Sequence, residues 1–197
     1  MDDRDGWLRV LDGIHDGMAH SLNGRLAGIG GLAQVARLRG DMDEELLEAL
    51  DDEARRLEQL AFVAARLPRH DRGSGSVASL AEAVAAAAAL QQVAKRPPLA
   101  ASAGVDAVAL RIAPDDLTRC LLLVASALEP AAGRNSQLEV SAAEAHILVR
   151  LTEAAPGAEL DARALAGAQR IAASAGGSVT EAEGGAAVEM ALPRAGL

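Results

Sequence analysis

The apolar positions near the start of the chain recur every three or four residues, which is the period of an amphipathic helix. They form one stripe from Trp7 to Ala36, with polar residues on the other faces. Its members are Trp7, Leu11, Ile14, Met18, Leu22, Leu26, Ile29, Ala33 and Ala36. At about 1.5 Å per residue, this helix runs to roughly 45 Å. Arg39 and Gly40 end it, because glycine favours the position just after a helix.

A second stripe with the same period follows at once, from Leu46 to Leu67. Asp41, with Glu44 three residues later, predicts a capping box at its start. The acidic residues of its first turns suit a helix N-terminus, so we interpret them as a solvated helix start. Two long helices joined by a short turn lie antiparallel, and a lone pair leaves much of each stripe exposed. Since four helices usually close such a core, we predict a homodimer in which two hairpins form a four-helix bundle.

Pro68 stops the second helix, and the polar, glycine-rich stretch 69–76 is the best domain boundary in the chain. We therefore divide the sequence into a helical hairpin at 1–68, a linker at 69–76 and a second domain at 77–197.

The second domain alternates between helical and strand-like patterns. We predict helices over 80–94, 114–128 and 160–174, and strands over 108–112, 138–140, 147–151, 179–182 and 188–192. The expected fold class is α+β: a long N-terminal helical hairpin followed by an α/β sandwich with its helices on one face of a mixed sheet.

Composition narrows the functions open to the chain. Of its 197 residues 50% are hydrophobic, yet 1% are aromatic and the net charge is −9. An acidic chain with few aromatic rings repels phosphate backbones and offers little on which bases can stack, so we expect protein or small-ligand partners, no nucleic acid and no membrane. The start of the chain lacks a signal-peptide pattern, and Cys120 has no second cysteine to pair with. We expect a complete cytoplasmic chain in which Cys120 is a buried structural thiol.

His20 lies two residues from an apolar stripe position on either side, about 200° around the helix from each. We therefore predict that its side chain points away from the stripe and into solvent. His15 lies at the edge of the buried face and is interpreted as structural. His70 and His146 have no partner at a metal-ligand spacing, so we predict no metal site.

The helix face around His20 is nearly bare of side chains. Its members are Gly13, Asp16, Gly17, Asn23, Gly24, Ala27, Gly28 and Gly31. Each interior glycine costs a helix up to about 1 kcal/mol relative to alanine, so something must require them. One explanation is close packing against a neighbouring helix. The other is that a partner must bring its own active site within bonding distance of the imidazole.

Imidazole suits such a task, because a neutral ring nitrogen is nucleophilic near pH 7 and the resulting phosphoramidate passes its phosphoryl group onward readily. Asp16, one turn before His20, has the spacing to hold the other ring nitrogen.

Residues 20–34 resemble the phosphoacceptor box of sensor histidine kinases, in which the first histidine is phosphorylated; the segment reads HSLNGRLAGIGGLAQ. The sequence departs from the family pattern at three places. Ser21 replaces an acidic residue that assists transfer, Gly24 replaces the residue that positions water for phosphatase activity, and Arg25 replaces a helix-bending proline.

The second half resembles the ATP-binding domain of the same kinases, in a degenerate form. Leu122 and Ser126 occupy the positions aligned with its metal-binding asparagines, and Glu153 and Gly157 mark the turn that reads adenine. The segment after Gly157 is too short for the family's ATP lid. The resemblance therefore implies that this chain binds neither ATP nor any other cofactor.

Together these features resemble the histidine phosphotransferases of sporulation and cell-cycle relays. The resemblance implies that His20 carries a phosphoryl group between response-regulator receiver domains, which supply Mg²⁺, with a hybrid histidine kinase as an upstream partner. The expected docking residues around His20 are Asp16, Gly17, Ser21, Asn23, Gly24 and Arg25. Two alternatives stay open: a pseudokinase adaptor that carries no phosphate, and a residual ATP-dependent histidine kinase.

Overall fold

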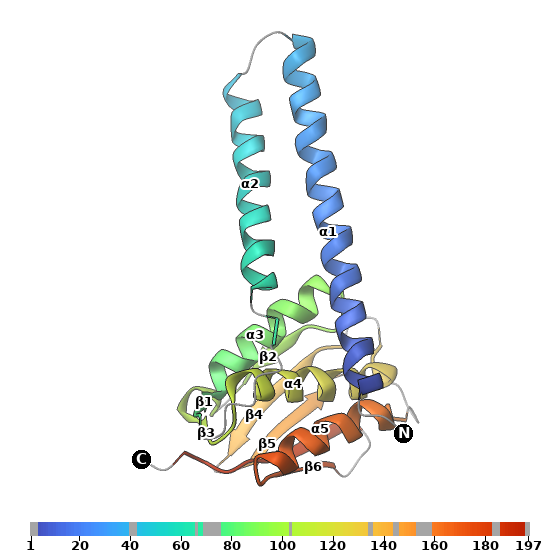
Figure 1. Cartoon of the computed structure of the whole chain (residues 1–197), viewed down its shortest axis with the longest axis vertical. Coiled ribbons are helices and arrows are strands. Elements are labelled where there is room, and N and C mark those ends of the chain that lie inside the picture. The colour runs from blue at the N-terminus through green and yellow to red at the C-terminus, as the bar shows by residue number, and fades with distance from the viewer. Residues whose placement is uncertain are drawn as a thin grey trace.

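The computed structural model describes residues 4–39, 43–65, 67–68, 76–102, 104–133, 136–143, 146–152, 159–182 and 186–195. Two long helices stand as a stalk on a layered base of helices and strands (Figure 1). This architecture confirms the predicted α+β class, with an N-terminal hairpin and a C-terminal sandwich. Most of the predicted linker lies outside the described residues, so the domain boundaries stay predictions.

The stalk consists of α1 (Arg4–Arg39) and α2 (Glu44–Ala64), which run antiparallel (Figure 1). The Asp43 carboxylate caps α2 by accepting a hydrogen bond from the Leu46 backbone N–H at 2.9 Å. The predicted cap at Asp41 is therefore wrong, because a helix that starts at Glu44 exposes its free N–H groups to the side chain one residue earlier. Asp41 itself lies outside the described residues.

No helix in the described ranges combines the length and apolar character that a bilayer span requires.

The base contains a five-stranded mixed sheet. Its order is β2 (Leu99–Ala101), β4 (Leu138–Ala143), β5 (His146–Leu151), β7 (Ala187–Ala191) and β6 (Ser178–Glu181). β2 runs parallel to β4, and the other neighbours are antiparallel. A separate ladder joins β1 (Ala78–Ser79) to β3 (Ala109–Leu110). The short β1 and β2 were not predicted, because strands of two or three residues show no alternation.

Three helices cover one face of the sheet, as predicted: α3 (Leu80–Val93), α4 (Pro114–Leu128) and α5 (Ala162–Ser174) (Figure 1). Two short 3-10 turns, Val105–Ala107 and Glu129–Ala131, flank α4 in the sequence. α4 is buried almost all round, which explains its long apolar run. Buried rows cross the sheet beneath the helices; they are Val140, Val149 and Val188, and Ile147, Met190 and Val179.

The first turns of α1 pack into the helical layer of the base. Val10 and Ile14 are each only 1% exposed and belong to the same apolar core as α3, α4 and α5. The guanidinium of Arg119 on α4 lies 5.0 Å from the centre of the Trp7 ring. Arg9 forms an ion pair with Asp161, the N-cap of α5, at 3.1 Å. The foot of the stalk is thus part of the core of the base.

Glycine allows α1 to approach the end of α3 closely. A Cβ at Gly17 would overlap the carbonyl oxygen of Val93 and lie 2.9 Å from the Cα of Ala94. A Cβ at Gly13 would collide with the guanidinium of Arg96. We call this contact of Gly13 and Gly17 with residues 93–96 the junction. Its backbone partners cannot move aside as a flexible side chain could.

We predict that Gly17→Ala lowers the free energy of unfolding by about 1–3 kcal/mol, because the added methyl group overpacks a backbone contact. The matched variant Gly31→Ala, at a position where a Cβ meets no atom within 4 Å, should gain up to about 1 kcal/mol from helix propensity alone. Urea unfolding monitored by circular dichroism measures both. Equal effects of the two substitutions would contradict close packing at Gly17.

Candidate functional site

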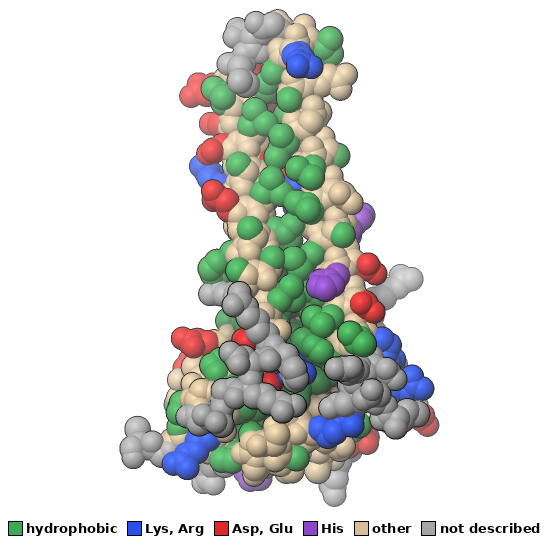
Figure 2. Space-filling view, viewed as in Figure 1, with side chains coloured by type: hydrophobic (Ala, Val, Ile, Leu, Met, Phe, Trp, Pro, Cys, Tyr) green, Lys and Arg blue, Asp and Glu red, His purple; other side chains and the backbone are tan. Residues whose placement is uncertain are grey.

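His20 is exposed on α1, as its spacing predicted. Figure 2 shows one histidine side chain at the outer edge of this helix and another on the face toward the viewer. No hydrogen bond or ion pair among the described residues holds the His20 ring, and no such bond joins it to Asp16, which is also exposed. Both ring nitrogens are therefore free to meet an incoming group.

His15 is also exposed, so its interpretation as a residue at the edge of the buried face is wrong. The neighbouring Ile14 turns into the base, and one residue of helical rotation, about 100°, carries His15 to the solvent side.

His146 pairs with Glu189, with 2.7 Å between Nδ1 and Oε1, on exposed parts of β5 and β7. His70 lies outside the described residues. Within the described ranges, no three His, Cys, Asp or Glu side chains gather as metal ligands do.

The bare face of α1 divides into two parts. Gly13 and Gly17 pack in the junction, so the close-packing explanation holds for them, and Gly17 faces a neighbour within its own chain rather than an approaching partner. At Gly24 and Gly31, by contrast, an added Cβ would meet no atom within 4 Å. Nothing in the described part of the chain explains why side chains are missing there.

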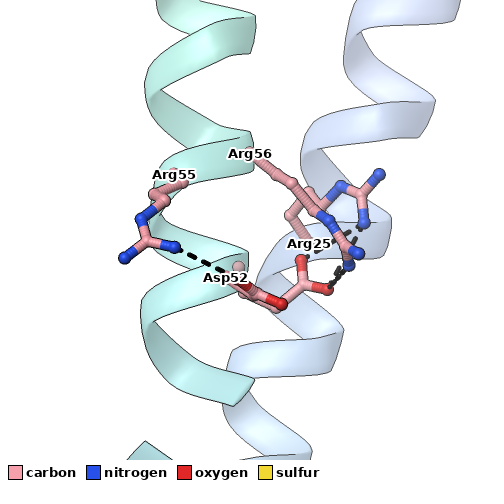
Figure 3. Close-up of polar contacts among 5 residues, drawn as sticks. Arg25, Asp52, Arg55 and Arg56 are labelled. Atoms are coloured by element: carbon pink, nitrogen blue, oxygen red, sulfur yellow. Dashed lines mark hydrogen bonds and ion pairs between the residues drawn. The ribbon is translucent and has the colours of Figure 1, made fainter. Parts of the chain in front are cut away.

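Arg25 braces α1 against α2. Nη1 of Arg25 lies 3.3 Å from both carboxylate oxygens of Glu53. Nη1 of Arg56 lies 2.8 Å from Oε1 of Glu53 (Figure 3). Glu53 is 16% exposed and Arg25 36%. The expected docking residue Arg25 is thus engaged within the hairpin, whereas Asn23 is exposed and Ser21 half-buried beside His20.

Sequence reasoning missed the residues at the end of α3. Lys95 is exposed and has a φ of 55°, and Nη1 of Arg96 lies 3.3 Å from Oε2 of Glu129. Pro97 and Pro98 predict where α3 ends, but no local pattern indicates that this end rests against α1 one turn from His20.

The positions aligned with a nucleotide site lie in different surroundings. Leu122 is 1% exposed in the core of α4, and Ser126 is half-buried on the same helix. Glu153 and Gly157 lie outside the described residues. A buried leucine side chain has no atom that can bind a metal.

Cys120 is buried, as predicted. Its Sγ lies 3.6 Å from the carbonyl oxygen of Ala168 and 3.7 Å from Sδ of Met190. Burial, and to a lesser degree the nearby Asp116 carboxylate, raises the pKa of the thiol from 9.0 to about 12. The thiol therefore stays protonated at neutral pH and is unsuited to nucleophilic chemistry.

No protein-family model matches the chain, and neither does any curated protein. Among solved structures, a bacterial phosphotransferase is similar at 17% identity and a TM-score of 0.46, over 93% of this chain and 95% of that one. The histidine kinase AdeS of Acinetobacter baumannii is similar at 14% identity and a TM-score of 0.47, over 90% and 98%. The cytoplasmic segment of the histidine kinase QseC gives 18% identity and a TM-score of 0.43, over 75% and 92%.

Proposed function

We propose that this chain is a histidine phosphotransferase that relays a phosphoryl group between response-regulator receiver domains through His20. The exposed and unengaged His20 ring is the observation that supports this best. Beside it, Asn23 and Gly24 are exposed, and the space over Gly24 is open. A visiting domain can therefore approach the ring closely.

The proposed transfer balances without a further reactant. One ring nitrogen of His20 attacks the phosphorus of an aspartyl phosphate; an N–P bond forms, the P–O bond to the aspartate breaks, and the aspartate leaves as a carboxylate. The proton on the other ring nitrogen passes to solvent, which reaches the exposed ring. In the second half, the carboxylate of another receiver attacks the phosphoryl group, and the imidazole leaves and regains its proton.

On this proposal the chain holds neither metal nor nucleotide. Mg²⁺ belongs to the acidic pocket of the receiver, where it neutralises charge on the phosphoryl oxygens. The buried Leu122 favours this division of labour over an ATP-dependent kinase, since a kinase needs a metal ligand at that position.

The test is incubation with purified receiver domains encoded in the same genome, each phosphorylated beforehand with acetyl phosphate and Mg²⁺. We expect one or more of them to label the wild-type chain and leave His20→Ala unlabelled, because His20 is the proposed acceptor and its ring is exposed and unengaged among the described residues. His15→Ala, a matched change to an exposed histidine on the same helix, should keep the label. Labelled protein is detected by phosphate-affinity electrophoresis.

Three other outcomes would contradict the proposal. Label that survives in His20→Ala would place the acceptor elsewhere. Receiver binding without any transfer would support the adaptor alternative, for which the replacement at Ser21 and the engaged Arg25 are the favouring observations. Label acquired from Mg-ATP alone would support the residual kinase.

The hairpin carries an apolar face that the described residues of its own chain leave exposed. Large apolar side chains that are strongly exposed follow both helices of the stalk (Figure 2); they are Leu22, Leu26, Val35, Leu38, Leu47 and Phe62. A row of this length is unusual on a monomer surface. We propose that the same face of a second copy covers it, because two hairpins complete a four-helix core.

The double variant Leu22→Glu/Leu26→Glu should convert the dimer to a monomer, because four buried carboxylates per dimer have no partner there. Leu22 is 43% exposed and Leu26 is 53% exposed in the single chain. Leu8→Glu, at a 49% exposed position near the foot of α1, is the control and should stay dimeric. Light scattering decides between the 20.1 kDa of one chain and twice that mass. A wild-type protein that is monomeric at micromolar concentration would contradict the dimer.

A further inference from the structure

We propose that Lys95 is a docking residue for the partner receiver, contacting carboxylates at the rim of its phosphorylation pocket while His20 meets the phosphoryl group. This inference rests on the proposed function. It names a second element of the docking surface, contributed by the base of the molecule rather than by the stalk.

The position of Lys95 follows from the junction. Gly17 packs against Val93 and Ala94, and Lys95 is the next residue along the chain. His20 is three residues after Gly17, so the two are neighbours on the surface of α1. Figure 1 shows the C-terminal end of α3 reaching α1 at the foot of the stalk. A domain that docks over His20 therefore also covers the end of α3.

Lys95 occupies a backbone turn that favours glycine over lysine. The N–H of Arg96 donates to the carbonyl oxygen of Gln91 at 3.0 Å, and the N–H of Lys95 donates to that of Gln92 at 3.2 Å. These two bonds form a Schellman motif, whose left-handed residue is usually glycine. Lys95 takes that left-handed conformation with a φ of 55°. A strained residue at such a turn is a reason to look for a role of its side chain.

The charge of Lys95 is available to a partner. It is the single lysine among the 19 basic residues of the chain. Three arginines around the foot of the stalk are ion-paired: Arg9 with Asp161, Arg96 with Glu129 and Arg119 with Asp116. For the exposed Lys95 ammonium, the described residues provide no such carboxylate.

This available charge matters because the rest of the chain is acidic. A net charge of −9 repels an approaching pocket built of carboxylates. One free cation next to the acceptor histidine reverses that repulsion locally and orients the partner. The neighbouring Arg96, held by Glu129 and by its contact at Gly13, fixes the turn that presents Lys95.

The experiment measures phosphotransfer from the receiver that labels wild-type His20, as initial rates over a range of receiver concentrations. Lys95→Glu should raise KM about tenfold with kcat unchanged and should weaken the salt dependence, whereas Lys95→Arg should keep the wild-type KM. Arg111→Glu makes the same change in net charge at an exposed position on the β3–α4 connection and should leave KM within about twofold of wild type.

Lys95→Gly separates docking from folding. Glycine fits the left-handed turn, so this variant should unfold at a higher urea concentration than wild type and still show a raised KM. A merely structural role for Lys95 predicts instead that KM follows stability. A further readout is acylation by an N-hydroxysuccinimide ester, since Lys95 is the only side-chain amine: bound receiver should slow its modification several-fold, measured by mass spectrometry of its peptide.

The outcomes distinguish this inference from the proposed function. If no receiver labels the wild-type chain, the proposed function fails and this inference fails with it. If the wild type is labelled but Lys95→Glu has the KM of Arg111→Glu, or if bound receiver leaves the acylation rate of Lys95 unchanged, only the docking role of Lys95 is overturned.

Discussion

The contact between Gly17 and the backbone of Val93 and Ala94 is the constraint on which the arrangement of this molecule depends. It lets α1 approach the end of α3 more closely than any side chain on that face would permit. Along the same contact, Val10 and Ile14 are buried in the base, and Arg9 forms its ion pair with Asp161 at the start of α5. The stalk therefore continues the core of the base, and the height of His20 above that base is fixed.

This constraint bears on what the histidine can do. An autophosphorylating kinase must carry its own nucleotide site to its histidine, which requires movement between the two parts of the chain. Here the foot of α1 is packed among α3, α4 and α5, and separating it would expose apolar surface to water. Under the proposed function, this arrangement suits a histidine that receives its phosphoryl group from a separate domain, and the end of α3 is a fixed part of the surface proposed to meet that domain.

Much of the fold could be predicted from periodicity. The stripe on α1, the apolar run of α4 and the proline and glycine signals identified the hairpin and the helices of the base, and the position of His20 between stripe residues correctly predicted its exposure. These features depend on a residue's neighbours along one element. Two short strands and the cap at Asp43 escaped prediction, because they depend on pairings or on a helix start that differs by a residue or two.

The contacts around the candidate site could not be predicted, because each joins residues far apart in the sequence. Arg25 was predicted to be a docking residue, but it pairs with Glu53 on α2. His15 was predicted to lie at the edge of the buried face, but it is exposed. Glycines at 13, 17, 24 and 31 are alike in sequence, yet only the first two have backbone or side chains against them. Tertiary structure therefore decides which glycine packs against another part of the chain and which leaves the helix surface open to a partner.

The distance between the stalk and the base in solution shows whether the junction holds α1 rigidly on the base. Spin labels at Gln34→Cys on α1 and Thr180→Cys on β6, in a chain diluted with excess unlabelled protein, report this distance by double electron–electron resonance; the buried Cys120 stays unlabelled. A rigid junction predicts one narrow distribution that Mg-ATP does not change. A broad distribution, or a second and shorter distance that Mg-ATP populates, would contradict it.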